Sequence, residues 1–87
     1  MKKRFDPDYA SAPGEILSET LAAIGMTQTE LARRMCRPIK TINEIVKGKA
    51  RLTEQTAIGL ERELKAPAEF WMALESNYRL MLERRRK

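Results

Sequence analysis

The strongest constraint on this chain is the stretch at residues 27–49, TQTELARRMCRPIKTINEIVKGK. Its apolar residues recur every three or four positions on both sides of a short break, a pattern that predicts two amphipathic helices joined by a tight turn. Thr27 and Glu30 have the T-x-x-E spacing of a capping box, which marks the start of the first helix. Gly48 suits the left-handed backbone position just past the end of the second helix. We therefore expect the rest of the chain to fold around these two helices.

The second of these helices, expected from about Pro38 to Lys47, has two chemically different faces. One face consists of the apolar residues Ile42, Ile45 and Val46. The opposite face carries Lys40, Asn43, Glu44 and Lys47, with Thr41 at the boundary. A helix that is fixed to the body by one face and presents hydrogen-bonding side chains on the other can lie in the major groove of DNA. The stretch is therefore interpreted as a DNA-binding helix-turn-helix.

Three further helices are expected around this pair. They are predicted from Pro13 to the residue before Gly25, from the Thr53 cap to about Lys65, and from about residue 67 to 84. No segment alternates with a period of two over a useful length, so no strand is expected. We predict an all-α bundle of five short helices. It forms a single domain at residues 13–87, with the helix-turn-helix at about 27–48 and a flexible arm at residues 1–12.

Composition narrows the chemistry available to the chain. Its 87 residues suit one domain, and they include no histidine and a single cysteine, Cys36. The lack of histidine excludes Cys/His zinc sites and histidine-based catalysis, so we expect no enzyme activity, metal or cofactor. No apolar stretch approaches the roughly 18 residues of a membrane span. The basic N-terminus lacks the apolar core of a signal peptide, so the expected location is the cytoplasm.

Positive charge is concentrated in the central stretch. Between Arg33 and Arg51, seven basic residues are opposed by Glu44 alone, so this segment carries a charge of +6, whereas the whole chain carries +5. A basic patch on a nearly neutral body suggests a polyanionic partner. The alternative is an ordinary solvated charged face.

Side chains along the second helix are candidates for base contacts. Lys40 can donate to guanine, Asn43 can pair with adenine or a phosphate, and Glu44 can accept from a cytosine amine. Ile39 lies at the N-terminal end, where it could meet a thymine methyl group. Glu44 has an alternative role as an ion-pair partner of Lys40 or Lys47, which are three or four residues away.

Phosphate contacts are expected around the same helix. Gln28 opens the first helix, so its side chain and the neighbouring N–H groups can meet a phosphate. Basic residues on either side can hold the DNA backbone, namely Arg37, Lys47, Lys49 and Arg51. For Arg37 the alternative is simple solvent exposure. The predicted DNA-binding set is Gln28, Arg37, Ile39, Lys40, Thr41, Asn43, Glu44, Lys47 and Lys49.

Several separated motifs together carry a family resemblance. The pattern T-Q-x-E-L-A-x-x-M…T-I-x-E-I-x-x-G-K resembles the helix-turn-helix of the phage-repressor-like (XRE) family. Four further motifs resemble the HigA group of antitoxins: PGEIL at 13–17, LTEQTA at 52–57, PAEFW at 67–71 and NY at 77–78. The resemblance covers about residues 13–82 and implies a five-helix, lambda-repressor-like DNA-binding fold. Positions matching the family's usual DNA contacts are Gln28, Ile39, Lys40 and Glu44.

The resemblance also implies a function and partners. HigA-type antitoxins belong to type II toxin–antitoxin modules, in which they repress their own operon and neutralise an RNA-cleaving toxin. The implied partners are double-stranded operator DNA with an inverted repeat, a second copy of the chain, and a RelE/HigB-like toxin. The implied setting is the bacterial cytoplasm, in association with the nucleoid. Three alternatives remain: a plain XRE-family regulator without a toxin, the DNA-binding part of an ImmA/IrrE-type system, and a protein-binding module that only shares the fold.

The fifth helix has two competing uses. Its aromatic residues Phe70, Trp71 and Tyr78 lie at core spacing and suit a role in closing the core. In a homodimer the same helix would also offer an apolar patch to a second subunit. The predicted dimer interface consists of Leu74, Tyr78, Met81 and Leu82.

Two positions depart from the pattern that the family implies. The turn between the two central helices usually contains glycine where this chain has Cys36. Cys36 must therefore adopt a strained left-handed conformation, or the turn must shift. The family also often has an apolar residue where Arg37 stands, and this arginine adds charge near the DNA.

Overall fold

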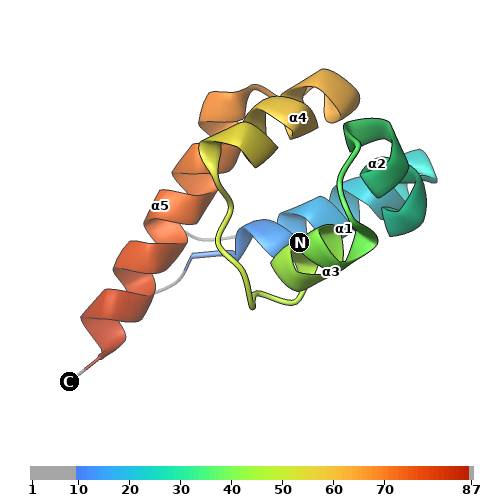
Figure 1. The fold of residues 1–87 in the computed structure, drawn as a ribbon. Helices are drawn as coiled ribbons and strands as arrows, with labels where there is room; N and C mark the ends of the chain where they lie inside the picture. Colours follow the sequence, from blue (N-terminus) through green and yellow to red (C-terminus); the bar gives the residue numbers. More distant parts are fainter. Residues whose placement is uncertain (1–9, 87) are drawn as a thin grey trace.

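The computed structural model describes residues 10–86, which fold into five α-helices without a strand (Figure 1). The helices are α1 Pro13–Ile24, α2 Gln28–Met35, α3 Ile39–Val46, α4 Glu54–Leu64 and α5 Ala68–Arg85. The predicted all-α fold is confirmed. Pro38 and Pro67 precede α3 and α5 as N-caps instead of lying inside their first turns. Residues 1–9 of the predicted arm lie outside the described residues.

The helix starts are secured by hydrogen bonds from side chains. The Thr27 hydroxyl accepts the N–H of Glu30 at 3.0 Å, and the Thr53 hydroxyl accepts that of Thr56 at 3.3 Å. Proline at the start of α5 cannot cap with its side chain. The cap comes instead from α4, where the Glu61 carboxylate accepts the N–H of Ala68 at 2.6 Å. This bond ties the start of α5 to α4 across the short connection between them.

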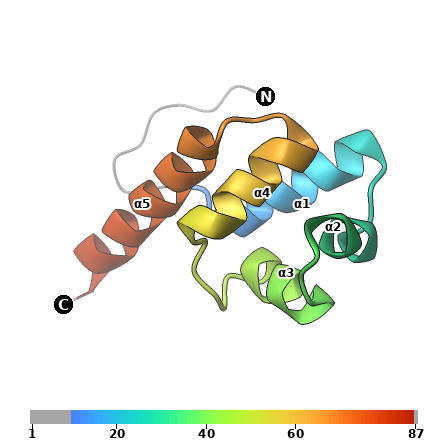
Figure 2. The ribbon, with the colours of Figure 1, turned by 45° about the horizontal axis from the view of Figure 1, so that its top comes forward.

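Each helix contributes one large, fully buried side chain to a shared core. These five residues are Leu17, Leu31, Ile42, Leu60 and Trp71. The N-terminal half of α5 packs on α4, whereas its C-terminal half extends away from the other helices (Figures 1 and 2). The core therefore lies between all five helices, and α3 forms one outer edge of the molecule.

The aromatic and apolar pattern of α5 was only partly predictive of burial. Trp71 is fully buried, but Phe70 is 42% exposed and lies edge-on against the Trp71 ring. Met81, and not Leu82, belongs to the interior, since Met81 is 6% exposed and Leu82 is 38% exposed.

Two glycines allow close helix packing, and they differ in what surrounds them. A Cβ atom on Gly14 would lie 2.5 Å from the carbonyl oxygen of Val46 and closer still to that of Ile45. A Cβ atom on Gly59 would lie 2.7 Å from the terminal methyl group of Met35. The start of α1 thus rests directly on the backbone at the end of α3, whereas α4 rests on a flexible side chain of α2.

We predict that Gly14→Ala lowers the free energy of unfolding by about 2 kcal/mol or more, because backbone carbonyls cannot move aside. Gly59→Ala is the matched control: Met35 can change rotamer, and alanine is favoured over glycine inside a helix by about 1 kcal/mol. Urea unfolding followed by circular dichroism measures both variants. Equal loss of stability in the two would contradict the distinction between backbone and side-chain contact.

Candidate nucleic-acid interface

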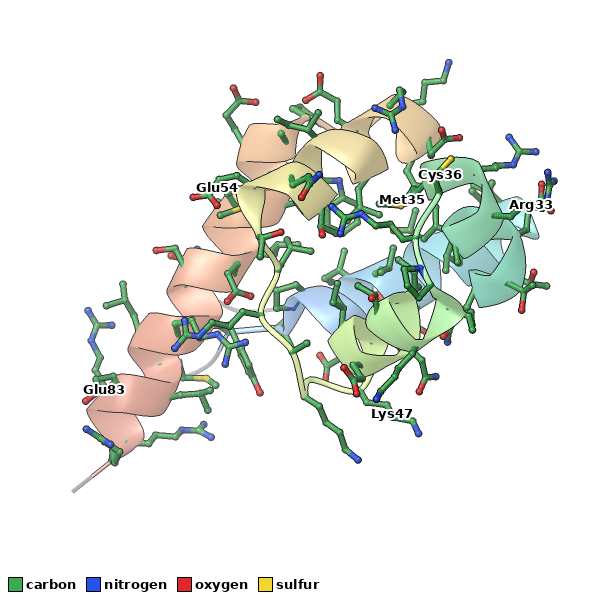
Figure 3. All side chains as sticks on the ribbon, viewed as in Figure 1. Arg33, Met35, Cys36, Lys47, Glu54 and Glu83 are labelled. Atoms are coloured by element: carbon green, nitrogen blue, oxygen red, sulfur yellow. The ribbon has the colours of Figure 1, made fainter. Side chains whose placement is uncertain are left out.

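Helix α3 is anchored by one face and open on the other. Ile42 and Ile45 are buried at 0% and 3% exposure, while Lys40 and Lys47 on the outer side are exposed. Lys47 points away from the helical body at the edge of the molecule (Figure 3). The division of α3 into an apolar and a polar face, predicted from its spacing, is confirmed.

A hydrogen bond between side chains joins the outer face of α3 to the start of α2. The Asn43 amide nitrogen donates to the side-chain oxygen of Gln28 at 3.2 Å, and both residues are half-buried. Asn43 therefore keeps one N–H and its oxygen for other partners, and Gln28 keeps its own amide N–H groups. The sequence placed these two residues in the same predicted site without indicating that they bind each other.

The turn between α2 and α3 is closed by a strained residue. Cys36 is exposed and adopts φ 56° and ψ 43°, which is the left-handed conformation. Its N–H donates to the carbonyl of Arg33 at 3.2 Å, and the N–H of Arg37 donates to that of Ala32 at 2.9 Å. This is the Schellman motif, which Gly25 and Gly48 form after α1 and α3. Of the two possibilities for Cys36, the strained conformation is therefore the one adopted.

Glutamates hold three of the seven basic residues in the central stretch. Glu30 binds Arg33 at 2.5 Å and Arg34 at 2.7 Å, and Arg34 also lies 3.9 Å from Glu63. The hydrogen bonds from Arg33 and then Arg34 lower the pKa of Glu30 from 4.5 to about 2. Glu30 therefore stays ionised in the native state down to about pH 2, whereas in the unfolded chain it takes up a proton near its ordinary pKa of 4.5. The stabilisation from this pairing is full above about pH 4.5 and is lost progressively as the pH falls from there to about 2. Arg51, the third residue, lies 4.0 Å from Glu75 of α5.

The positive charge that is not paired with a carboxylate is consequently smaller than the +6 counted from the sequence, and it belongs to fewer residues. Within residues 10–86, no carboxylate lies within 4.0 Å of the four remaining basic residues, Arg37, Lys40, Lys47 and Lys49. In the same part of the chain, Glu44 forms no ion pair. The alternative that Glu44 pairs with Lys40 or Lys47 is therefore wrong for this structure.

The other predicted contact residues lie on or beside α3. Ile39 is 45% exposed at the N-terminal tip of α3, Thr41 is half-buried and Lys49 is exposed. Arg37 is half-buried and lines a hollow with α4 residues that include Gln55 and Arg62. Arg37 thus lies between the turn and α4, while the other predicted residues surround the outer face of α3.

The residues predicted for a dimer interface do not form one exposed patch. Met81 is buried, and its sulfur accepts the N–H of Ala10 at 3.0 Å, so the chain's own N-terminal segment covers it. Leu74 and Tyr78 are half-buried, and only Leu82 is exposed. Leu80, which was not predicted, is 49% exposed. The spacing of Leu80 from the buried Trp71 could have predicted this exposure. Nine residues are about two and a half helical turns, which places Leu80 on the opposite, outer side of α5.

The described residues offer neither a metal site nor a membrane-spanning helix. Among residues 10–86, no group of three or more His, Cys, Asp or Glu side chains could hold a metal ion. No helix in this range is long and apolar enough to cross a membrane. The outer face of α3 with its flanking lysines is thus the polar surface that the charge distribution singles out.

Comparison with known proteins assigns the chain to a class. The model of the helix-turn-helix family matches residues 17–71, which is more than half of the chain. The protein belongs to the helix-turn-helix family. This assignment agrees with the α2–turn–α3 geometry and with the five-helix fold.

Solved structures of antitoxins resemble the chain more specifically. Pseudomonas aeruginosa antitoxin HigA, solved with the higBA promoter, is 34% identical, has a TM-score of 0.82, and matches over 86% of this chain and 83% of that one. A HigA-family addiction module antidote protein from Coxiella burnetii is 30% identical with a TM-score of 0.80, over 83% and 79% of the two chains. The uncharacterised HTH-type transcriptional regulator YddM of Escherichia coli is 31% identical over 68 residues, which are 78% of this chain and 72% of YddM. Within its family the chain is thus of the HigA type.

We predict that Cys36→Gly raises the free energy of unfolding by about 1 kcal/mol, because glycine adopts the left-handed conformation without the cost of a Cβ atom. For a domain of this size the melting temperature rises by roughly 4–8 °C. Cys36→Ala is the control, since alanine keeps the Cβ atom. Thermal unfolding that showed the same gain for alanine would attribute the effect to loss of the thiol and not to the backbone.

Proposed function

We propose that this protein is a sequence-specific DNA-binding antitoxin that represses its own operon and neutralises an RNA-cleaving toxin of the RelE/HigB kind. The observation that carries the proposal is the outer face of the anchored helix α3, where no carboxylate of residues 10–86 lies within 4.0 Å of Lys40 or Lys47. The similarity to HigA, solved with the higBA promoter, supports it.

In the proposed complex α3 lies in the major groove and reads bases with three side chains. Lys40 donates to guanine, and Glu44 accepts from the amino group of cytosine. Asn43 pairs with adenine through its oxygen and its second N–H, because its first N–H is held by Gln28. The bond to Gln28 fixes the plane of the Asn43 amide before DNA arrives, which lowers the entropy cost of that contact.

The proposed phosphate contacts surround the three base-contacting side chains. Gln28, at the first position of α2, directs its amide and the neighbouring backbone N–H groups toward a phosphate. Lys47 and Lys49 hold the backbone beyond the end of α3, and Arg37 holds it beside the turn. Each such contact releases counterions, so affinity falls steeply as salt rises. Ile39 and Thr41 complete the surface with contacts that depend on how their side chains fit against the DNA.

A homodimer would place two copies of α3 on an inverted repeat, with half-sites about one helical turn apart. The C-terminal half of α5, which extends from the body, supplies apolar surface for pairing (Figure 2). We include Leu74, Tyr78 and Leu82 in this surface. The exposed Leu80 lies almost half a turn away from Leu82, on the groove side of α5, and is not part of it. Met81 joins it only if the segment at Ala10 moves away.

A plain transcriptional regulator without a toxin is the second candidate. It is favoured by the similarity to YddM, which is described as an HTH-type transcriptional regulator. The two candidates share the DNA-binding surface and differ in the protein partner. The gene next to this one distinguishes them, because a small basic RelE-like reading frame there supports the antitoxin.

We predict different defects for Lys40→Ala and Lys49→Ala. Lys40→Ala removes a base contact, so it lowers discrimination at one base pair by about 1–3 kcal/mol. Lys49→Ala removes a phosphate contact, so it weakens binding to every sequence and reduces the salt slope by about 1. Gel-shift titrations at two salt concentrations, with the upstream DNA and a scrambled duplex, measure both effects. Equal affinity of the unmodified protein for the two duplexes would contradict the proposal that it represses transcription in a sequence-specific way.

We predict that co-expression of this protein restores growth to cells that express the toxic product of the neighbouring gene. Lys40→Ala should still restore growth, because the change is confined to one side chain on the outer face of α3, which we propose binds DNA. Growth on inducing plates and copurification of the two proteins provide the measurements. If neither occurs while operator binding persists, the plain regulator replaces the antitoxin.

A further inference from the structure

A buried carboxylate joins α5 to the segment that follows α3. Glu75, in the middle of α5, is only 6% exposed. Its carboxylate accepts a hydrogen bond from Arg79 at 2.7 Å and lies 4.0 Å from the guanidinium of Arg51. All three side chains line an open groove along α5, in which Met72 and Leu80 provide the apolar part. Neither the motifs nor the proposed function account for this cluster.

Arg51 lies close to the proposed DNA-binding surface. It stands two residues after Lys49, in the connection from α3 to α4. The start of this connection is bound to the end of α3, because the Glu44 carbonyl accepts the N–H groups of Lys49 at 2.8 Å and Ala50 at 3.2 Å. A change in the direction of the Arg51 side chain therefore alters the positive charge beside α3.

The two ion pairs of Glu75 differ in strength. The pair with Arg79 is short, lies within one helix, and involves side chains that are 8% and 25% exposed. The pair with Arg51 is long, and the Arg51 side chain is 72% exposed. A pair of this length, with its arginine in solvent, contributes little to stability, so Arg51 can exchange Glu75 for another anion at small cost. Arg79 continues to compensate the buried charge when Arg51 leaves.

We propose that Glu75 is a positioning residue that competes with DNA phosphate for Arg51 and so limits sequence-independent binding. When Arg51 is held by Glu75, its charge is neutralised and directed toward α5. When a phosphate approaches the α3–α4 connection, Arg51 transfers to it and adds one contact to those of Lys47 and Lys49. This inference rests on the proposed DNA-binding function.

The sign of the effect distinguishes this role from ordinary stabilisation. A residue that only stabilises the fold would weaken DNA binding when it is changed. Loss of the Glu75 charge should instead strengthen binding to every sequence, roughly two- to fivefold, because Arg51 no longer has a competing partner. The slope of log affinity against log salt should steepen toward the value for one more phosphate contact, about 0.9.

The test uses the full chain and a double-mutant cycle. Wild type, Glu75→Gln, Arg51→Ala and the double variant are titrated with upstream and scrambled duplexes at several salt concentrations. Glu75→Gln keeps the shape of the side chain and a hydrogen bond to Arg79. Glu83→Gln is the matched control: Glu83 lines the same groove nearer the end of α5, and its loss changes net charge equally (Figure 3). Sedimentation checks that the oligomeric state is the same for all variants.

The expected result is tighter and more salt-dependent binding for Glu75→Gln, with the gain absent in the Arg51→Ala background and absent in Glu83→Gln. An equal gain for Glu83→Gln, or a gain that persists without Arg51, would overturn the proposal and assign the effect to net charge. Weaker binding by Glu75→Gln with a lower melting temperature would make Glu75 a structural residue only. If wild type shows no preference for the upstream duplex, the proposed function itself fails, which is a separate outcome.

Discussion

The close contact between the start of α1 and the end of α3 is the constraint on which the recognition surface depends. A helix of eight residues is too short to persist in water by itself, so α3 must be held by packing. Ile42 and Ile45 fix its inner face, and Gly14 lets α1 approach the carbonyls of its last turn. The direction of α3, and with it the position of each side chain on its outer face, is set by a contact that permits no Cβ atom.

Three of the four arginines in the central stretch have a different role from its lysines. Glutamates bind the arginines at positions 33, 34 and 51, and these pairs connect α2 with α4 and the α3–α4 connection with α5. Within the described part of the chain, the lysines on and after α3 form no ion pair. Planar guanidinium groups suit fixed multiple bonds to carboxylates, whereas a lysine is a mobile point charge that can follow a phosphate. The positive surface offered to DNA is thus made mainly of flexible side chains on a rigid support.

Local sequence information was sufficient to predict where the helices lie. It was insufficient to predict the contacts between segments that are distant in sequence. The spacing of apolar residues, the Thr27 and Thr53 caps and the glycine after α3 correctly located the helix-turn-helix, because each signal acts within one or two turns. The burial of Met81 depends on Ala10, and the cap of α5 depends on Glu61. The partners of Arg51 and Asn43 are likewise distant in sequence. Such contacts arise from the packing of helices, which spacing along a single helix does not describe. The predicted DNA-contacting residues remain predictions, although most of them surround one face of α3.

The core with one large buried side chain from every helix has a consequence for the behaviour of the protein in solution. Removal of any helix would leave a hole lined by the other four, so no smaller part of the fold is complete, and unfolding should be a single cooperative event. The outer face of α3 and the extended half of α5 therefore unfold together. A ligand that binds the native state at either place raises the melting temperature of the whole molecule. Occupancy of the operator and resistance to proteolysis would then rise and fall together.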